Sequence, residues 1–255
     1  LYAKQDRYIT DDRTRHLSEM SYFSCNCEVC SRFTPKELFS LKQQERTNEI
    51  ALHNLYAIKA EVDRVKESIH EGRLWEYTMK KMRSHPKLFE VIDVFVRNYT
   101  YFENTTPVFK EKAVFLFSKE DQFRPEVQNY HRIVRKFSSK KRILCMVKDT
   151  QIKPAYLSPQ YTALKKKFKD PEKVQFCQYN PFLGIIPFEI SDIFPASHYL
   201  SSNRNYEPKD FTEFEKTWNV FFAKNNFAEI YFDKNNLFLN YFVKQIPKGI
   251  RKKSL

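Results

Sequence analysis

A cluster of three cysteines is the feature that most constrains what this chain can fold into. Cys25, Cys27 and Cys30 form a C-x-C-x-x-C pattern, and His53 follows Cys30 after 22 intervening residues. Zinc prefers a tetrahedron of thiolate and imidazole ligands, and three cysteines with one histidine is a common structural set. Disulfides between such close cysteines would be strained, and an iron–sulfur cluster would need a fourth cysteine. The pattern therefore predicts one structural zinc ion in a closed site.

Composition excludes several other classes of protein. The 255 residues include only three glycines, Gly72, Gly184 and Gly249. Their positions match neither the G-x-G-x-x-G loop nor the G-x-x-x-x-G-K-[ST] loop, so these two nucleotide-binding motifs are excluded. No run approaches 18 apolar residues, which excludes a transmembrane helix. The two remaining cysteines, Cys145 and Cys177, lie in apolar runs, and we expect them to be reduced core residues.

The first hundred residues carry helical signals. A capping box at Thr34-Pro35-Lys36-Glu37 predicts the start of a short helix. Apolar residues spaced by threes and fours then predict one face of a long helix, which Gly72 would end in a left-handed turn. The residues of this face are Ala51, Leu55, Ile58, Val62, Val65 and Ile69. We therefore expect residues 1–100 to form one mainly helical, zinc-binding section.

The pattern changes to α/β after Pro107. Apolar runs of strand length at 114–117, 143–147 and 174–177 alternate with helical segments at 125–136 and 161–169. This order predicts an α/β module over 107–183 with a parallel sheet. A third section, 184–255, begins near Gly184 and reads as a small α+β module. It has a capping box at Asp210-Phe211-Thr212-Glu213, a strand at 228–232 and a basic, frayed tail from 248.

Most of the chain's net charge of +13 lies in one window. Residues 132–173 hold 13 basic and 3 acidic side chains, a net of +10. A concentrated positive field attracts polyanions, and nucleic acid is the commonest large one. The alternative is a solvated surface that only keeps the protein soluble. The candidate RNA-binding residues are Arg132, Lys140, Lys141, Arg142, Lys165, Lys166, Lys167 and Lys169.

Several segments together resemble the archaeal-type tRNA-guanine transglycosylases. The metal pattern with its 22-residue gap is the most specific of them, and the likeness extends over most of residues 1–200. The other matching segments are Leu1-Tyr2-Ala3-Lys4, Arg7-Tyr8-Ile9-Thr10, Leu52-His53-Asn54-Leu55-Tyr56, Gly72-Arg73-Leu74-Trp75-Glu76, Arg124-Pro125-Glu126-Val127, Lys153-Pro154-Ala155-Tyr156 and Asn180-Pro181-Phe182-Leu183-Gly184.

This resemblance implies a fold and a function. Enzymes of the family replace a guanine in the D-arm of tRNA by 7-cyano-7-deazaguanine, on the path to archaeosine. Their fold is a (β/α)8 barrel with a zinc subdomain near its end, followed by two small α/β modules and a PUA domain. The chain would be the C-terminal part of such a cytoplasmic enzyme. Its zinc, on Cys25, Cys27, Cys30 and His53, would be structural and lie near a homodimer contact.

The resemblance assigns no catalytic residue in this chain. In the family an aspartate attacks the ribose and a second carboxylate moves protons, and both lie upstream of the zinc pattern. Asp6, Asp11 and Asp12 match no such motif, and we expect turn residues there. The front of the barrel and the PUA domain are missing, so the piece alone should be inactive.

Two alternative functions remain open. One is a paralogue similar to archaeosine synthase, which resembles this chain around Lys153-Pro154 and Ser158, although Ala155 interrupts the paralogue's Lys-Pro-Tyr sequence. The other is a non-catalytic subunit that binds tRNA or mediates dimerisation.

Overall fold

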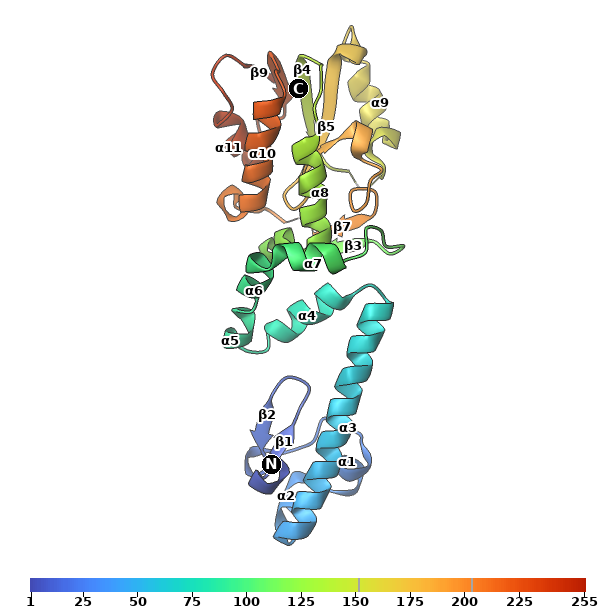
Figure 1. The fold of residues 1–255 in the computed structure, drawn as a ribbon, viewed down its shortest axis with the longest axis vertical. Helices are drawn as coiled ribbons and strands as arrows, with labels where there is room; N and C mark the ends of the chain where they lie inside the picture. Colours follow the sequence, from blue (N-terminus) through green and yellow to red (C-terminus); the bar gives the residue numbers. More distant parts are fainter. Residues whose placement is uncertain (151, 203) are drawn as a thin grey trace. The chain divides into compact units, whose positions relative to one another are not determined.

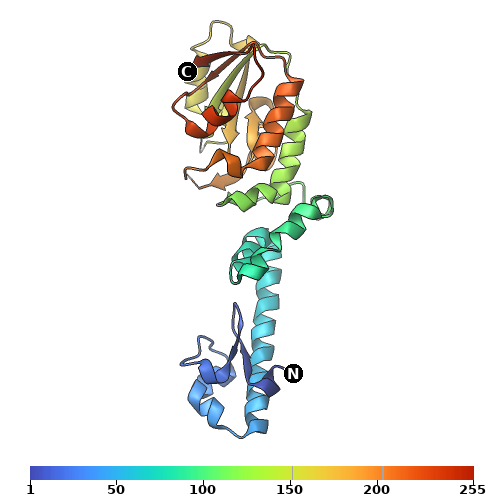
Figure 2. The same cartoon turned by 90° about the vertical axis from the view of Figure 1, so that its left-hand side faces the viewer.

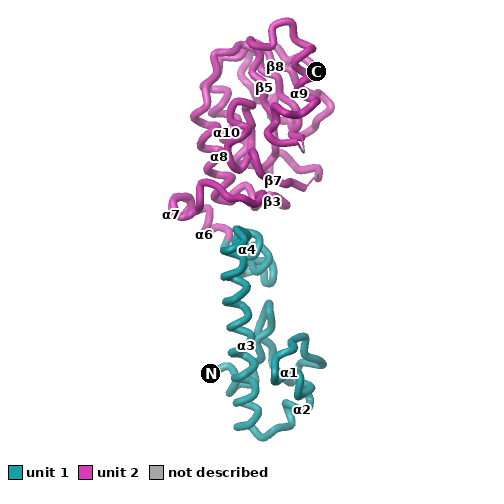
Figure 3. The backbone as a smooth tube through the Cα atoms, turned by 90° about the vertical axis from the view of Figure 1, so that its right-hand side faces the viewer, with its two compact units in different colours: residues 1–91 teal, residues 92–255 magenta. Residues whose placement is uncertain are grey.

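The structure is a computed structural model that describes residues 1–150, 152–202 and 204–255 (Figure 1). The chain divides into two compact units, unit 1 at 1–91 and unit 2 at 92–255 (Figure 3). Each unit has its own hydrophobic core. Among the described residues, no helix combines the length and the apolar character needed to cross a bilayer.

Unit 1 is a short β-hairpin with helices, the longest of which is α3 (Gln43–His70). The hairpin strands are β1 (Arg7–Ile9) and β2 (Thr14–His16), which pair in antiparallel fashion. The other helices are α1 (Glu28–Arg32), α2 (Pro35–Ser40), α4 (Leu74–Met82) and α5 (Pro86–Phe89). A small core of Ala3, Leu17, Val29, Leu38 and Ile50 joins the hairpin side to α1, α2 and α3.

Both predicted signals for helix ends in unit 1 are confirmed. The side chain of Thr34 accepts a hydrogen bond from the backbone N–H of Glu37, and the Glu37 carboxylate accepts one from the backbone N–H of Thr34, so the capping box is complete. After α3, Gly72 adopts a φ of 67°. That left-handed conformation strains residues with a Cβ atom, which explains why glycine stands there.

The apolar stripe of α3 forms as a helix face, but its middle is not covered within unit 1. Leu55, Ile58, Val62 and Ile69 are 65%, 51%, 46% and 58% exposed. The buried positions of α3 are instead Ile50, His53, Asn54 and Ser68, three of which are polar. Periodicity therefore predicted the helix correctly but did not show which surface packs inside this unit.

Unit 2 is built on a five-stranded sheet with the strand order β6-β5-β4-β8-β9. Strands β5, β4, β8 and β9 are parallel, and β6 is antiparallel to β5. Their bounds are β4 (Ile143–Lys148), β5 (Val174–Asn180), β6 (Gly184–Pro187), β8 (Glu229–Phe232) and β9 (Arg251–Ser254). Parallel strands need crossover connections, and helices supply them.

Helices cover both faces of this sheet. On one face, α8 (Pro125–Lys136) lies beside α10 (Thr212–Lys224), as Figure 2 shows, and α11 (Leu237–Lys244) belongs to the same core. On the other face, α9 (Pro159–Lys165) packs Leu164 near Cys145 and Phe176. Helices α6 (Ile92–Arg97) and α7 (Tyr99–Thr105) precede this layer.

Cys145 and Cys177 are buried free thiols, as expected.

The strands of unit 2 are connected differently from the expectation. The predicted strand at 114–117 forms as β3 (Val114–Leu116), but it pairs with β7 (Tyr199–Ser201) in a separate two-stranded sheet. Strands on both sides of the expected division at 183/184 belong to one sheet, because β6 and β8 join β5 and β4. Strand pairing is a long-range property that local composition does not reveal.

Two local expectations in 184–255 were wrong. Helix α10 has Phe211 at its N-cap position with no side-chain cap, so the box at 210–213 does not form. The side chain of Gln122 instead accepts the hydrogen bond from the backbone N–H of Glu213, at 3.1 Å. The tail is not frayed, because residues 251–254 pair with β8 as the edge strand β9.

A polar network lies buried between α8, α10 and β6. The His131 imidazole bonds through Nδ1 to Thr217 Oγ1 and through Nε2 to the carbonyl of Phe182, both at 2.7 Å. Gly184 lies against this ring: a Cβ atom there would stand 2.9 Å from His131 Cε1. Its φ of 78° also favours glycine. His131 is therefore a fully bonded core residue.

Candidate metal centre

The structure brings the four predicted metal ligands together. One ligand atom from each of Cys25, Cys27, Cys30 and His53 lies within 4.8 Å of the other three. Cys27 occupies the N-cap position of α1 and Cys30 lies in its first turns, while His53 comes from α3. A loop with one short helix thus supplies three thiols, and a second helix supplies the imidazole.

The separations between these atoms suit a tetrahedral zinc ion. His53 Nδ1 lies 3.4 Å from the Sγ atoms of both Cys27 and Cys30, and those two sulfurs are 3.5 Å apart. Zinc–sulfur bonds of about 2.3 Å and zinc–nitrogen bonds of about 2.0 Å imply separations of about 3.5 to 3.8 Å between tetrahedral ligands. The donor set fits one Zn²⁺, and three of its four donors have the spacing of a tetrahedral site, while Cys25 Sγ lies within 4.8 Å of them.

The backbone of β1 fixes which nitrogen of His53 faces the sulfurs. His53 Nε2 lies 2.8 Å from the carbonyl oxygen of Ile9. A carbonyl can only accept, so Nε2 carries the proton and Nδ1 presents its lone pair to the thiol cluster. A metal-bound histidine commonly donates its second N–H to such an oxygen. The side chain is 1% exposed, and burial lowers the pKa of His53, although the bond to Ile9 acts in the opposite direction.

Tyr8 supports the cluster from the hairpin. Its ring stacks on the His53 imidazole at a centroid separation of 3.6 Å, and its hydroxyl lies 2.9 Å from Cys30 Sγ. Phe23 stacks on the other side of Tyr8, at 4.8 Å. Burial raises the pKa of Cys30 to about 12 and, more strongly, that of Tyr8. The metal-free Cys30 thiol is therefore protonated at neutral pH, and a metal ion must displace its proton to bind.

Asn54 ties the same hairpin to α3. Its Oδ1 accepts from the backbone N–H of Ile9 at 2.9 Å, and its Nδ2 donates to the carbonyl of Arg7 at 3.0 Å. These bonds and the His53–Ile9 bond hold β1 along the helix. A metal ion in the cluster would add the loop at 25–30 to this assembly. With four protein ligands, a zinc ion here would have no open position for water or substrate, and its role would be structural.

The three aspartates without a motif make local and tertiary ion pairs. Asp6, which has a φ of 52°, pairs with Arg46 at 2.8 Å. Asp11 pairs with Arg64 at 2.8 Å, and Asp12 pairs with its neighbour in the hairpin turn, Arg13. The backbone confirms the expectation of turn residues, because Asp6 lies in a turn and Asp11 and Asp12 lie in the bend between β1 and β2.

The candidate RNA-binding residues lie on three segments of unit 2. Arg132 is on α8, residues 140–142 precede β4, and residues 165–169 include the end of α9. Three of the eight pair with carboxylates: Arg132 with Glu103 at 2.5 Å, Lys141 with Glu189 at 2.9 Å and Lys165 with Glu172 at 3.5 Å. The other five, Lys140, Arg142, Lys166, Lys167 and Lys169, are exposed.

Comparison with known proteins places the metal centre inside a recognised family region. Residues 1–87 match the family model described as queuine tRNA-ribosyltransferase. The tRNA-guanine(15) transglycosylase of Saccharolobus solfataricus is 34% identical over 239 residues, which cover 90% of this chain and 46% of the relative. The enzyme of the same name from Methanocaldococcus jannaschii is 37% identical over 213 residues, which cover 81% of this chain and 31% of the relative.

The chain is a homologue of the archaeal tRNA-guanine transglycosylases. The resemblance seen in its sequence is thereby confirmed. The chain spans less than half the length of these relatives. In the present chain, the matched region contains the four candidate ligands together with Tyr8 and Asn54. The sequence analysis gave these two supporting residues no role. Asn54 adjoins His53 in sequence, but its bonding partners lie 45 and 47 residues away, so no local signal identifies them.

Proposed function

We propose that this chain is the C-terminal part of a tRNA-guanine transglycosylase, which exchanges a D-arm guanine of tRNA for 7-cyano-7-deazaguanine in the cytoplasm. Unit 1 would be the end of the catalytic barrel with its zinc subdomain. The observation that carries this proposal is the cluster of Cys25, Cys27, Cys30 and His53 inside the segment matched by the family model. One bound Zn²⁺ would hold the loop, the hairpin and α3 together.

The charge distribution supports a role for unit 2 in holding tRNA. The window 132–173 lies wholly in this unit and has a net charge of +10. Lysine and arginine contacts to phosphates supply affinity and position, while specificity comes from contacts to bases. We therefore assign the exposed basic residues to the backbone of tRNA.

The uncovered stripe on α3 supports the proposed homodimer contact of unit 1. Leu55, Ile58 and Val62 are each about half exposed or more on one helix face. Exposed apolar groups that gather on one surface commonly mark protein contacts. We expect Ile58→Glu to reduce self-association in sedimentation velocity and the exposed Lys59→Glu control to leave it unchanged. Equal association of the two variants would contradict this assignment.

A chimeric enzyme tests the proposed function. The matched segment of the Saccharolobus solfataricus relative would be replaced by this chain, and incorporation of labelled 7-cyano-7-deazaguanine into a tRNA transcript would be measured. We expect base exchange by the chimera and its loss when Cys27→Ser is introduced. A folded, zinc-loaded chimera that binds tRNA but exchanges no base would contradict the proposal. Amidation of nitrile-modified tRNA by the chain would instead favour the synthase-like alternative.

A further inference from the structure

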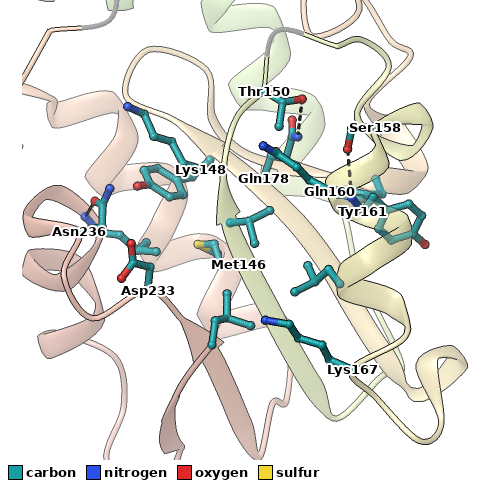
Figure 4. Close-up of a pocket in the computed structure, with 16 residues that line it drawn as sticks. Met146, Lys148, Thr150, Ser158, Gln160, Tyr161, Lys167, Gln178, Asp233 and Asn236 are labelled. Atoms are coloured by element: carbon teal, nitrogen blue, oxygen red, sulfur yellow. Dashed lines mark hydrogen bonds between the residues drawn. The ribbon is translucent and has the colours of Figure 1, made fainter.

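A cavity of about 340 Å³ opens on unit 2, and the residues that line it fall between 146 and 255. It lies between α9 and the loop that follows β8, across the end of β4 (Figure 4). This volume is at the lower end of the range typical of small-molecule sites, about 300 to 1,000 Å³. Polar side chains reach it from four segments: Lys148, Thr150, Gln160, Lys167, Asp233 and Asn236.

The position of the cavity follows from the topology of the sheet. After β4 the chain crosses through α9 on one face, and after the neighbouring strand β8 it crosses through α11 on the opposite face. The two connections diverge, which leaves a crevice outside the carboxyl ends of β4 and β8. In open parallel sheets, such a switch point is the place where ligands bind. The fold therefore creates this opening independently of unit 1.

The lining of the cavity combines positive charge with apolar walls. Lys148 and Lys167 come from opposite ends of it, and Asp233 adds a carboxylate (Figure 4). Val147, Leu164, Phe188 and Leu255 supply apolar surface between them. A ligand that fits this lining carries an anionic group at one end and a flat apolar body with polar edges.

A buried hydroxyl adds an independent sign of a missing partner. Tyr179 lines the cavity and is 2% exposed, and its hydroxyl has no partner at hydrogen-bonding geometry among the described residues. The Asn236 side chain faces this hydroxyl as a weak hydrogen-bond partner and lowers the Tyr179 pKa against the larger effect of burial, but the two atoms do not reach the geometry of a full hydrogen bond. Buried polar groups are almost always satisfied, so an orphaned hydroxyl beside a cavity fits a bound molecule.

We propose that this cavity binds a single nucleotide, with its phosphate at a lysine and its base against the apolar wall. Lys167 matches the phosphate, and at the other end the Tyr179 hydroxyl and the Nδ2 group of Asn236, whose Oδ1 caps α11, offer hydrogen-bonding groups to the edge of the base. The nucleotide would be a free mononucleotide or an unstacked residue of an RNA strand. The inference rests on unit 2 alone and does not require the transglycosylase reaction.

Calorimetric titration of the full chain tests the proposal. The probes are guanosine and adenosine 5′-monophosphates, the two nucleosides, inorganic phosphate and a single-stranded RNA hexamer. We expect a mononucleotide or the hexamer to bind at least about tenfold more tightly than phosphate or nucleoside alone. Binding of the hexamer alone identifies RNA as the source, and binding of both identifies a free nucleotide as a competent ligand.

Matched lysine variants separate a built site from general attraction. Lys167→Gln should weaken binding about tenfold, the usual cost of losing one charged hydrogen bond, while Lys169→Gln should weaken it less than about twofold. Tyr179→Phe, which removes only the orphaned hydroxyl, should weaken mononucleotide binding and leave phosphate binding unchanged. Absence of binding by every probe, equal losses in Lys167→Gln and Lys169→Gln, or phosphate binding as tight as that of a mononucleotide would overturn the proposal.

Discussion

Acidification should destabilise unit 2 through one buried imidazole. Burial, aided by the nearby positive charge of Arg135, lowers the pKa of His131 from 6.5 to about 4. Between about pH 4 and about pH 6.5, His131 therefore binds a proton more tightly in the unfolded chain than in the folded unit. The contribution of this group to stability is complete above about pH 6.5 and is lost as the pH falls toward about 4.

The two pKa values set the size of this effect. Linkage predicts that the free energy of unfolding of unit 2 falls by about 2 kcal/mol between about pH 7 and about pH 5. Urea titrations followed by tryptophan fluorescence can measure it. In a Trp75→Phe background the signal comes from Trp218, which is 1% exposed in the core of unit 2.

A variant that lacks the His131 imidazole provides the control for this measurement. His131→Gln keeps hydrogen-bonding capacity at this position but does not titrate, so it should start less stable and then show little change over the same pH interval. Groups shared by both proteins cancel in the comparison. The same decline of about 2 kcal/mol in His131→Gln, or no decline in the parent, would refute the reasoning.

Three other perturbations have defined outcomes. Gly184→Ala combines strain at a φ of 78° with a contact of 2.9 Å to His131, and should cost about 3 kcal/mol in the same urea titration; a loss below about 1 kcal/mol would contradict it. Glu126→Gln removes the carboxylate charge that lies 3.0 Å from the guanidinium of Arg124, a side chain that is 1% exposed, and should cost about 3 kcal/mol; an unchanged urea midpoint would count against this pair. Charge reversal of the three lysines at 165–167 should weaken tRNA binding and reduce the slope of log affinity against log salt, and an unchanged slope would mark these lysines as a solvated surface.

The local elements of this fold were largely predictable from sequence. The capping box at Thr34, the end of α3 at Gly72 and the strands at 143–147 and 174–177 all depend on neighbours within a few residues. The four ligands were predictable because their chemistry restricts the residue types and their spacing. What sequence could not show was pairing between distant segments, such as β3 with β7 or the tail with β8.

The supporting residues of the candidate site were hidden for the same reason. Tyr8 and Asn54 lie in segments that carry the family resemblance, but they act through contacts with residues 22 to 47 positions away, so the local sequence does not show their roles. The Asp210 box failed because a long-range partner, Gln122, took the N–H group that a local cap would have used. A capping pattern read from local sequence therefore fails where a buried side chain from another segment bonds to the same backbone N–H group.

Metal content of the purified chain tests the central claim most directly. Zinc per chain would be measured by mass spectrometry under native conditions for the parent, for Cys27→Ser and for Cys145→Ser, a buried cysteine outside the cluster. We expect one zinc ion per chain in the parent and in Cys145→Ser, and almost none in Cys27→Ser. Equal zinc in all three proteins, or none in the parent, would contradict the assignment of Cys25, Cys27, Cys30 and His53 as its ligands.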